Sequence, residues 1–427
     1  MDQSLLDRLK SLGVQVGASQ VKKPEKPSDR VPIEEVVPGA EHTTPFGSAF
    51  LADEQFPADY QHGLIPFSQK VDYSLLGEWA GYPTLREKPA NQFIFLDTET
   101  SGLAGGTGTF AFMIGLGWWQ SDGFRLQQFF LREPAEEAAV LAALDEVLTP
   151  FQTIVTYNGK AFDIPLLNTR HTLSAFQSPF PGMQHVDLLA LSRRIWRNRL
   201  PSRSLGSIEQ DVLSVSRSQE EIPGWMIPEM YFNYLKSGDS RPMAGVFYHN
   251  RMDILSLAAL FLHQSNLLSN PMDWLAAEGL DLIAIAKLYD DTGRRAQAVQ
   301  LYEHSLSLGL PRPFFIQTLY RYADLARKEL HFEQAVSLWQ KAADLQELPA
   351  CVELAKYYEH RAREYETALY WTQKALDFLD TQALPLYITK STLAELQKRQ
   401  GRLQRKMNNW RSYNEPEESE EETHDQS

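Results

Sequence analysis

The segment Phe93-Ile94-Phe95-Leu96-Asp97-Thr98-Glu99-Thr100 decides both the fold and the chemistry of this 427-residue chain. Four apolar residues predict a buried strand, and two acids follow directly at its end. Side chains alternate along a strand, so Asp97 and Glu99 lie on the same face of the sheet. Two adjacent carboxylates repel each other unless a cation lies between them, and a divalent ion prefers such oxygen ligands. The segment therefore predicts half of a metal site.

Two other stretches supply further acids. Thr153–Thr156 indicates a short buried strand, and Asp163 follows it at the start of a predicted helix, where a carboxylate is favoured. In the helix predicted over residues 244–267, His249 and Asp253 are four residues apart and share one face. Four carboxylates could then converge on two divalent ions about 4 Å apart, an arrangement that clamps the attacking and leaving oxygens of a phosphodiester. His249 would deprotonate or orient the attacking water.

The order of the predicted elements indicates an α/β fold. The sequence predicts strands over residues 93–97, 111–119, 124–131, 153–156 and, less regularly, 185–188. It predicts helices over residues 135–148, 165–170, 203–214, 228–236 and 244–267. Three antiparallel strands, followed by helix and strand in alternation, is the order of a ribonuclease-H-like mixed sheet flanked by helices. Asp187 follows the last strand, and we interpret it as a helix cap.

After about residue 275 the chain becomes all-helical with an internal period. The segments that begin at Arg295, Phe332 and Tyr365 carry a small residue at the same place, with steps of 37 and 33 residues between Ala298, Ala335 and Ala368. These segments resemble tetratricopeptide repeats, whose period is 34 residues. Such units bury their faces against neighbours, so three together form a credible domain.

The acidic motifs resemble those of the 3′–5′ exonuclease superfamily named for its Asp-Glu-Asp-Asp ligands. The matching patterns are Asp97-x-Glu99, Asn158-x3-Phe162-Asp163, and a His or Tyr before Asp253. Within the superfamily the chain most resembles the YprB-like bacterial proteins, which join a ribonuclease-H-like exonuclease domain to tetratricopeptide repeats. Further similar stretches are 200–205 and 222–225.

This resemblance implies specific roles for the matching residues. It places Mg²⁺ or Mn²⁺ at Asp97, Glu99, Asp163 and Asp253, and it implies that Asn158 and Phe162 shape the substrate groove. One pattern departs from the superfamily, where a catalytic His stands five residues before the last Asp, or a Tyr four residues before it. Here Tyr248 is five before and His249 four before. We favour His249, because its spacing places it over Asp253, and the role of Tyr248 stays open.

A basic run interrupts a chain whose formal net charge is −14. Five arginines lie within eleven residues around Trp196: Arg193, Arg194, Arg197, Arg199 and Arg203. One interpretation is a phosphate track with a stacking ring, in which Arg194, Arg197 and Arg203 bind substrate. The other is a solvated helix face with one buried aromatic. Four other tryptophans are expected to pack in the core or the repeats: Trp225, Trp274, Trp339 and Trp371.

These features predict four segments. They are a short helix and flexible linker over residues 1–45, an exonuclease domain over 46–270, helical repeats over 275–411 and a disordered acidic tail over 412–427. The single cysteine excludes an internal disulfide and suggests a reducing cytoplasm. No apolar run approaches the ~20 residues that span a bilayer, so no membrane partner is expected.

The sequence as a whole predicts a metal-dependent 3′–5′ exonuclease that acts on single-stranded DNA or RNA by a two-metal mechanism. The helical repeats would dock a protein partner or extend the substrate path. Two alternatives stay open. One is a nuclease-like scaffold that acts as an adaptor through its repeats, and the other is a structure-selective endonuclease on the same sheet.

Overall fold

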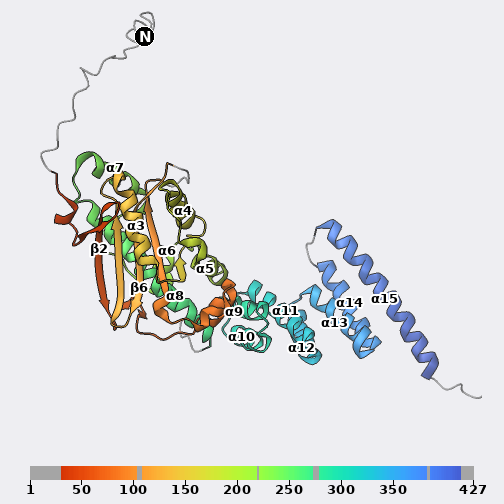
Figure 1. Ribbon diagram of the computed structural model, residues 1–427. Coiled ribbons are helices and arrows are strands. Elements are labelled where there is room, and N and C mark those ends of the chain that lie inside the picture. The colour runs from red at the N-terminus through yellow and green to blue at the C-terminus, as the bar shows by residue number, and fades with distance from the viewer. Residues whose placement is uncertain (1–29, 103–107, 219–220, 273–277, 382–384, 415–427) are drawn as a thin grey trace, which may run out of the picture. The chain divides into compact units, whose positions relative to one another are not determined.

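The computed structural model describes residues 30–102, 108–218, 221–272, 278–381 and 385–414 (Figure 1). The helix predicted at the N-terminus, most of the linker and the acidic tail from residue 415 lie outside these ranges. The described residues form two compact units. The first takes its residues from 1–193 and 202–269, and the second from 194–201 and 270–427.

The first unit is built on a seven-stranded sheet with the order β1-β2-β7-β6-β5-β8-β9. The strands are β1 (Ala40–Thr44), β2 (Gly47–Pro57), β5 (Phe93–Thr100), β6 (Ala111–Gln120), β7 (Gly123–Phe130), β8 (Thr153–Thr156) and β9 (Gln184–Asp187). The pairs from β1 to β5 are antiparallel, whereas β8 pairs parallel with both β5 and β9. The carboxyl ends of β5, β8 and β9 therefore meet at one edge of the sheet.

Helices pack against this sheet. The longest is α8 (Met243–Ser269), which is buried along most of its length and packs against β5 and β6, while α3 (Glu137–Leu148) packs against β1 and β2. Further elements are a small hairpin of β3 (Gln61–His62) and β4 (Ile65–Pro66), and the helices α2 (Ser74–Ala80), α4 (Asp163–Leu173), α5 (Leu188–Trp196), α6 (Leu205–Ile208) and α7 (Ile227–Ser237). The last three residues of α5 are assigned to the second unit. A π-helical turn, Glu209–Leu213, continues α6.

The predicted fold class is confirmed, and the strands from β5 onward lie where the sequence places them. The linker prediction was wrong for residues 30–45, which form a 3₁₀ turn at Ile33–Glu35 and the strand β1. Because β1 is an edge strand in which only Thr44 is buried, it lacks the apolar alternation by which strands are identified. Two apolar side chains before it, Ile33 and Val37, are buried in the core.

The second unit is all-helical. Its helices are α9 (Gly279–Asp291), α10 (Arg295–Ser307), α11 (Arg312–Lys328), α12 (Phe332–Asp344), α13 (Leu348–Tyr357), α14 (Tyr365–Thr381) and α15 (Leu386–Asn414). The three alanines of the sequence period, Ala298, Ala335 and Ala368, are each the fourth residue of α10, α12 and α14, and all three are fully buried. The period therefore marks the second helix of each successive pair. Their assignment as tetratricopeptide repeats stays a prediction.

No helix within the described ranges is both long and apolar enough to cross a lipid bilayer.

Candidate active site

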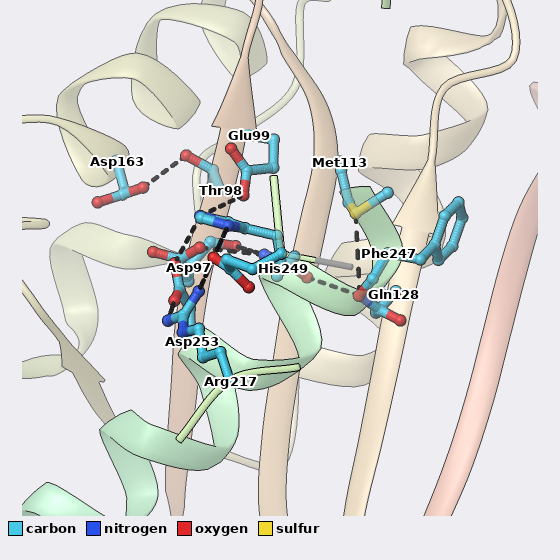
Figure 2. A network of polar contacts seen from close by, with 12 residues as sticks. Asp97, Thr98, Glu99, Met113, Gln128, Asp163, Arg217, Phe247, His249 and Asp253 are labelled. Atoms are coloured by element: carbon cyan, nitrogen blue, oxygen red, sulfur yellow. Dashed lines mark hydrogen bonds and ion pairs between the residues drawn. The ribbon is translucent and has the colours of Figure 1, made fainter. Parts of the chain in front are cut away.

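The three acidic stretches meet at the carboxyl end of β5 (Figure 2). Asp97 and Glu99 come from this strand, Asp163 is the first residue of α4, and Asp253 lies on α8. The Thr98 hydroxyl donates a hydrogen bond of 2.5 Å to Asp163 Oδ1 and so joins β5 to α4. One ligand atom each from Glu99, His249 and Asp253 lie within 4.8 Å of one another. Asp97 and Asp163 lie close enough to interact electrostatically with Glu99 and Asp253, and we call these five residues the carboxylate cluster.

The carboxylates of this cluster oppose one another electrostatically. Burial, followed by repulsion from Asp253 and Asp163, raises the pKa of both Asp97 and Glu99 well above the usual range. Burial also raises the pKa of Asp163 to about 6, although the Thr98 hydrogen bond opposes this. For Asp253 burial again raises the pKa, against the opposing charge of Arg217. Such a set of crowded oxygen donors fits a hard divalent cation, which would relieve the repulsion.

Sequence reasoning missed a cationic residue beside the cluster. The Arg217 guanidinium donates to Asp253 Oδ1, and it holds Glu209 through two bonds of 2.6 and 2.7 Å. It also donates to Glu221 Oε1 at 2.7 Å. Burial would lower the pKa of Arg217, but Glu209 and Asp253 outweigh it and raise the pKa. Nothing in the spacing of the sequence links Arg217 to Asp253, which lies 36 residues further on.

His249, rather than Tyr248, faces the carboxylates. His249 Nε2 lies 3.4 Å from Asp253 Oδ2 and 3.8 Å from Glu99 Oε1. Tyr248 lies elsewhere, since its hydroxyl accepts a hydrogen bond from the Ser218 backbone N–H and its ring lies beneath Arg251. The geometry therefore supports the choice of His249. A cavity of about 450 Å³ opens beside it, and its lining includes Asp253, Arg217, Glu209 and Glu221.

The residues expected to shape the substrate groove line a second cavity, of about 550 Å³. Asn158 and Phe162 line it together with Asp97 and Asp163. Phe162 leaves 57% of its surface exposed. The Asn158 backbone adopts the left-handed conformation, with φ of 68°, and its N–H donates to Asp187 Oδ1 at 2.8 Å. Asp187 Oδ1 also accepts from the Leu189 N–H at the start of α5, which confirms Asp187 as a helix cap.

The residues of the basic run are divided between the two compact units. Arg194 and Arg197 belong to the second compact unit, and there Arg194 pairs with Asp291. Arg203 belongs to the first unit, where its backbone carbonyl accepts a hydrogen bond from the Tyr157 hydroxyl. Trp196 is fully buried, so it offers no stacking ring. The structure favours the interpretation with a buried aromatic, and phosphate-binding roles for Arg194, Arg197 and Arg203 stay predictions.

The expectation that Trp225 packs in a core was wrong. Its surface is 72% exposed, whereas Trp339 and Trp371 are buried as predicted, and Trp274 lies outside the described residues. Trp225 follows Gly224, where an added Cβ atom would lie 3.8 Å from the His249 ring. The chain next to Trp225 therefore runs beside the carboxylate cluster. The preceding Pro223-Gly224 pair, which indicates a surface turn, was the signal that could have revealed this exposure.

The sequence of this chain matches a known protein family and a known relative. Residues 94–264 match the family model of the RNase_H superfamily, a span that contains all four carboxylates and His249. Over 338 residues the chain is 34% identical to the uncharacterized protein YprB of Bacillus subtilis (strain 168). The aligned region covers 76% of this chain and 80% of YprB. The chain belongs to the YprB family of the RNase_H superfamily. The resemblance predicted from the YprB-like motifs is thereby confirmed.

A solved structure is also similar, at a lower level. The family B DNA polymerase from the hyperthermophilic archaeon Pyrobaculum calidifontis matches with a TM-score of 0.33 and 18% sequence identity. The match covers 57% of this chain and 34% of the polymerase, so the likeness spans about a third of that protein. A similarity at this level says nothing about substrate or activity.

Proposed function

We propose that this protein is a metal-dependent 3′–5′ exonuclease that hydrolyses phosphodiester bonds of single-stranded nucleic acid. The observation that carries the proposal is that Glu99, Asp253 and His249 lie within 4.8 Å of one another, with Asp97 and Asp163 close enough to repel the two carboxylates. Membership of the RNase_H superfamily agrees with it, because the matched span contains all five residues.

The four carboxylates would hold two divalent ions, Mg²⁺ or Mn²⁺. When bound, such ions polarise the phosphodiester and lower the pKa of the attacking water. The donor set supports this assignment, since carboxylate repulsion adds to burial in raising the pKa of Asp97 and Glu99. Arg217 neutralises only part of this charge, because the same guanidinium also pairs with Glu209 and Glu221.

His249 would accept the proton of the attacking water. Its Nδ1 lies 2.8 Å from Glu221 Oε1. A carboxylate can only accept a hydrogen bond, and its contact is shorter than the 3.3 Å between Nδ1 and the donor Arg217 Nη1, so we assign the imidazole proton to Nδ1 and the lone pair to Nε2. Nε2 is the atom that faces Glu99 and Asp253. His249 is therefore held with its basic nitrogen toward the proposed reaction centre.

The substrate would lie across two exposed aromatic rings. Phe162 lines the cavity that contains Asp97 and Asp163, and Trp225 follows the glycine beside His249. Nucleobases of single strands stack on such rings without regard to sequence. The negative net charge of the chain does not oppose this proposal, because seven acids lie in residues 415–427 alone.

The proposal is tested with an oligonucleotide labelled at its 5′ end, incubated with Mn²⁺, with Mg²⁺ or with EDTA. We expect a metal-dependent ladder of shortened products that Asp97→Asn abolishes. Asp122→Asn is the matched control, because Asp122 is an exposed turn residue whose carboxylate accepts a hydrogen bond from Gln55. A ladder that persists in Asp97→Asn would refute the proposal.

The same assay separates the alternatives. A 3′-blocked oligonucleotide and a circular single strand should both resist the enzyme, whereas internal cuts in the circle would indicate an endonuclease. An inert scaffold should show neither cleavage nor a rise in melting temperature with Mn²⁺. Parallel ribo- and deoxyribo-substrates identify the nucleic acid. Docking of a protein partner on the helical repeats is a separate proposal that this assay leaves untouched.

A further inference from the structure

We infer that Asn250, held in one orientation by Gln128, positions the proposed metal ligand Asp97. The inference rests on the proposed function, because it concerns how a ligand of the metal site is fixed. Neither amide belongs to the acidic motifs. Both are buried, Asn250 completely and Gln128 with 4% of its surface exposed.

Sheet register brings these residues together. Asp97 on β5 pairs with Gly115 on β6, and Gly115 pairs in turn with Gln128 on β7. Residues directly opposite each other in an antiparallel sheet point to the same face. Asp97 and Gln128 therefore lie on one face with a glycine between them. The α8 helix crosses this face, and Asn250 bridges the two side chains.

The hydrogen bonds allow one orientation of each amide. Gln128 Nε2 donates to the Phe247 carbonyl at 2.8 Å (Figure 2). It also donates to Asn250 Oδ1 at 3.0 Å. A carbonyl can only accept, so Phe247 fixes the nitrogen of Gln128 on this side. Asn250 must then turn its oxygen toward Gln128 and its nitrogen toward Asp97. Asn250 Nδ2 donates to Asp97 Oδ2 at 3.0 Å.

Flipping Asn250 would reverse both contacts. Its oxygen would face the Asp97 carboxylate and backbone carbonyl, and its nitrogen would face the Gln128 amide nitrogen. Both new contacts are repulsive, and both are buried. Gln128 thus makes Asn250 present donors, rather than an acceptor, to Asp97. Hydrogen bonds of this kind orient metal ligands, and their loss typically weakens metal binding 10- to 100-fold.

Gly115 leaves the room that Asn250 needs. A Cβ atom at this position would lie 2.3 Å from Asn250 Oδ1 and 2.9 Å from Ile254 Cγ1. Since the glycine pairs with both Asp97 and Gln128, the gap falls at the point where the amide bridges them. Gly115, Gln128 and Asn250 therefore act together on the position of Asp97.

The test is calorimetric titration of the full-length protein with Mn²⁺, which measures binding without any reaction. We expect Gln128→Met to weaken Mn²⁺ binding about tenfold. Gln127→Met is the matched control. Gln127 is the adjacent residue of β7 and is equally buried, but it points to the opposite face and donates to Asp53. We expect the control to bind Mn²⁺ like the wild type.

A double-mutant cycle identifies the route of the effect. Asn250→Leu alone should weaken Mn²⁺ binding at least as much as Gln128→Met, and Gln128→Met should have no further effect in that background. The inference would be overturned if Gln128→Met lowered the Mn²⁺ affinity by the same factor in the wild-type and Asn250→Leu backgrounds. The inference would also be overturned if Gln128→Met bound Mn²⁺ with wild-type affinity. If Gln128→Met does not fold, wild-type Mn²⁺ affinity in Asn250→Leu would overturn it instead. If the wild type itself binds no Mn²⁺, the proposed function fails and this inference with it.

Discussion

His249 Nδ1 and Glu221 Oε1 lie 2.8 Å apart, a shorter contact than the 3.3 Å between the same nitrogen and Arg217 Nη1, so Glu221 is the nearer partner of the proposed base. We expect Glu221→Gln to lower the rate of single-turnover cleavage about 10- to 100-fold, because the amide can donate to Nδ1 and so allow the other tautomer. Substrate affinity should change little, since Glu221 does not face the cavity that contains Phe162. Glu229→Gln, an exposed acid on α7, is the control.

Asp97→Asn should stabilise the metal-free protein while it removes metal binding. Burial and three neighbouring carboxylates raise the pKa of Asp97, so its ionised form is unfavourable in the folded state at neutral pH. Removing the charge should therefore increase the free energy of unfolding of the metal-free protein. Urea titrations in EDTA measure this gain in the free energy of unfolding. Urea titrations with added Mn²⁺ should show that the metal does not stabilise the variant. A loss of stability with EDTA would contradict the repulsion argument.

The pH dependence of metal binding follows from Asp163. Burial raises its pKa from the usual 3.8 to about 6, so between these values the folded protein holds a proton that the unfolded chain has lost. The metal-free protein should therefore lose stability as pH rises from about 4 to about 6. Metal ions need the ionised carboxylate, so the rise in melting temperature with Mn²⁺ should be large at pH 7.5 and small at pH 5. Asp163→Asn should remove this contribution to both trends.

Trp225 should contribute to substrate binding more than to the chemical step. We expect Trp225→Ala to raise KM about tenfold with a smaller change in kcat, consistent with the loss of one stacked base, and Trp225→Phe to restore most of the affinity. Tyr387→Ala is the control, because Tyr387 is similarly exposed, at 74%, but lies in the helical unit. Equal KM values for Trp225→Ala and the wild type would exclude a stacking role.

Glu359 should stabilise the helical unit. This buried carboxylate bonds to Arg399, Arg402 and Lys406 of α15. Burial would raise its pKa, but the hydrogen bonds from Arg402 and Lys406 lower it to about 2. Its contribution is therefore complete above about pH 4.5 and is lost as pH falls toward 2.

We expect Glu359→Gln to lower the free energy of unfolding by about 3 kcal/mol at pH 7, because it leaves three cations without their partner. Chemical denaturation followed by circular dichroism measures the loss. Glu353→Gln, which removes one surface pair with Lys356, should change stability by less than about 1 kcal/mol.

The sequence was informative wherever chemistry repeats at short range. Strand alternation placed Asp97 and Glu99 on one face, and helical spacing placed His249 over Asp253, as the structure has them. The alanine period identified the second helix of each pair, because burial of a small residue is a local requirement of helix packing. Superfamily motifs supplied the order of the remaining acids. These signals sufficed for the fold class and for the expected members of the carboxylate cluster.

The missed residues depend on contacts between distant segments. Arg217 reaches Asp253 from a stretch of irregular structure, and Gln128 reaches Asp97 only through the register of three strands and the crossing of α8. Neither relationship leaves a periodic trace in the sequence. The pairing of Arg194 with Asp291, far along the chain, is another contact that the composition of the basic run did not predict. Trp225 was misjudged because an aromatic side chain favours burial unless a turn exposes it.

The space left by the missing side chain of Gly115 affects what a mutational scan of this protein will show. Replacing a residue that has no side chain should weaken metal binding about as much as replacing Asn250, since an added methyl group would displace the Asn250 amide. A list of positions at which substitution weakens metal binding will therefore include a glycine. A ranking of positions by the chemical reactivity of their side chains would miss Gly115.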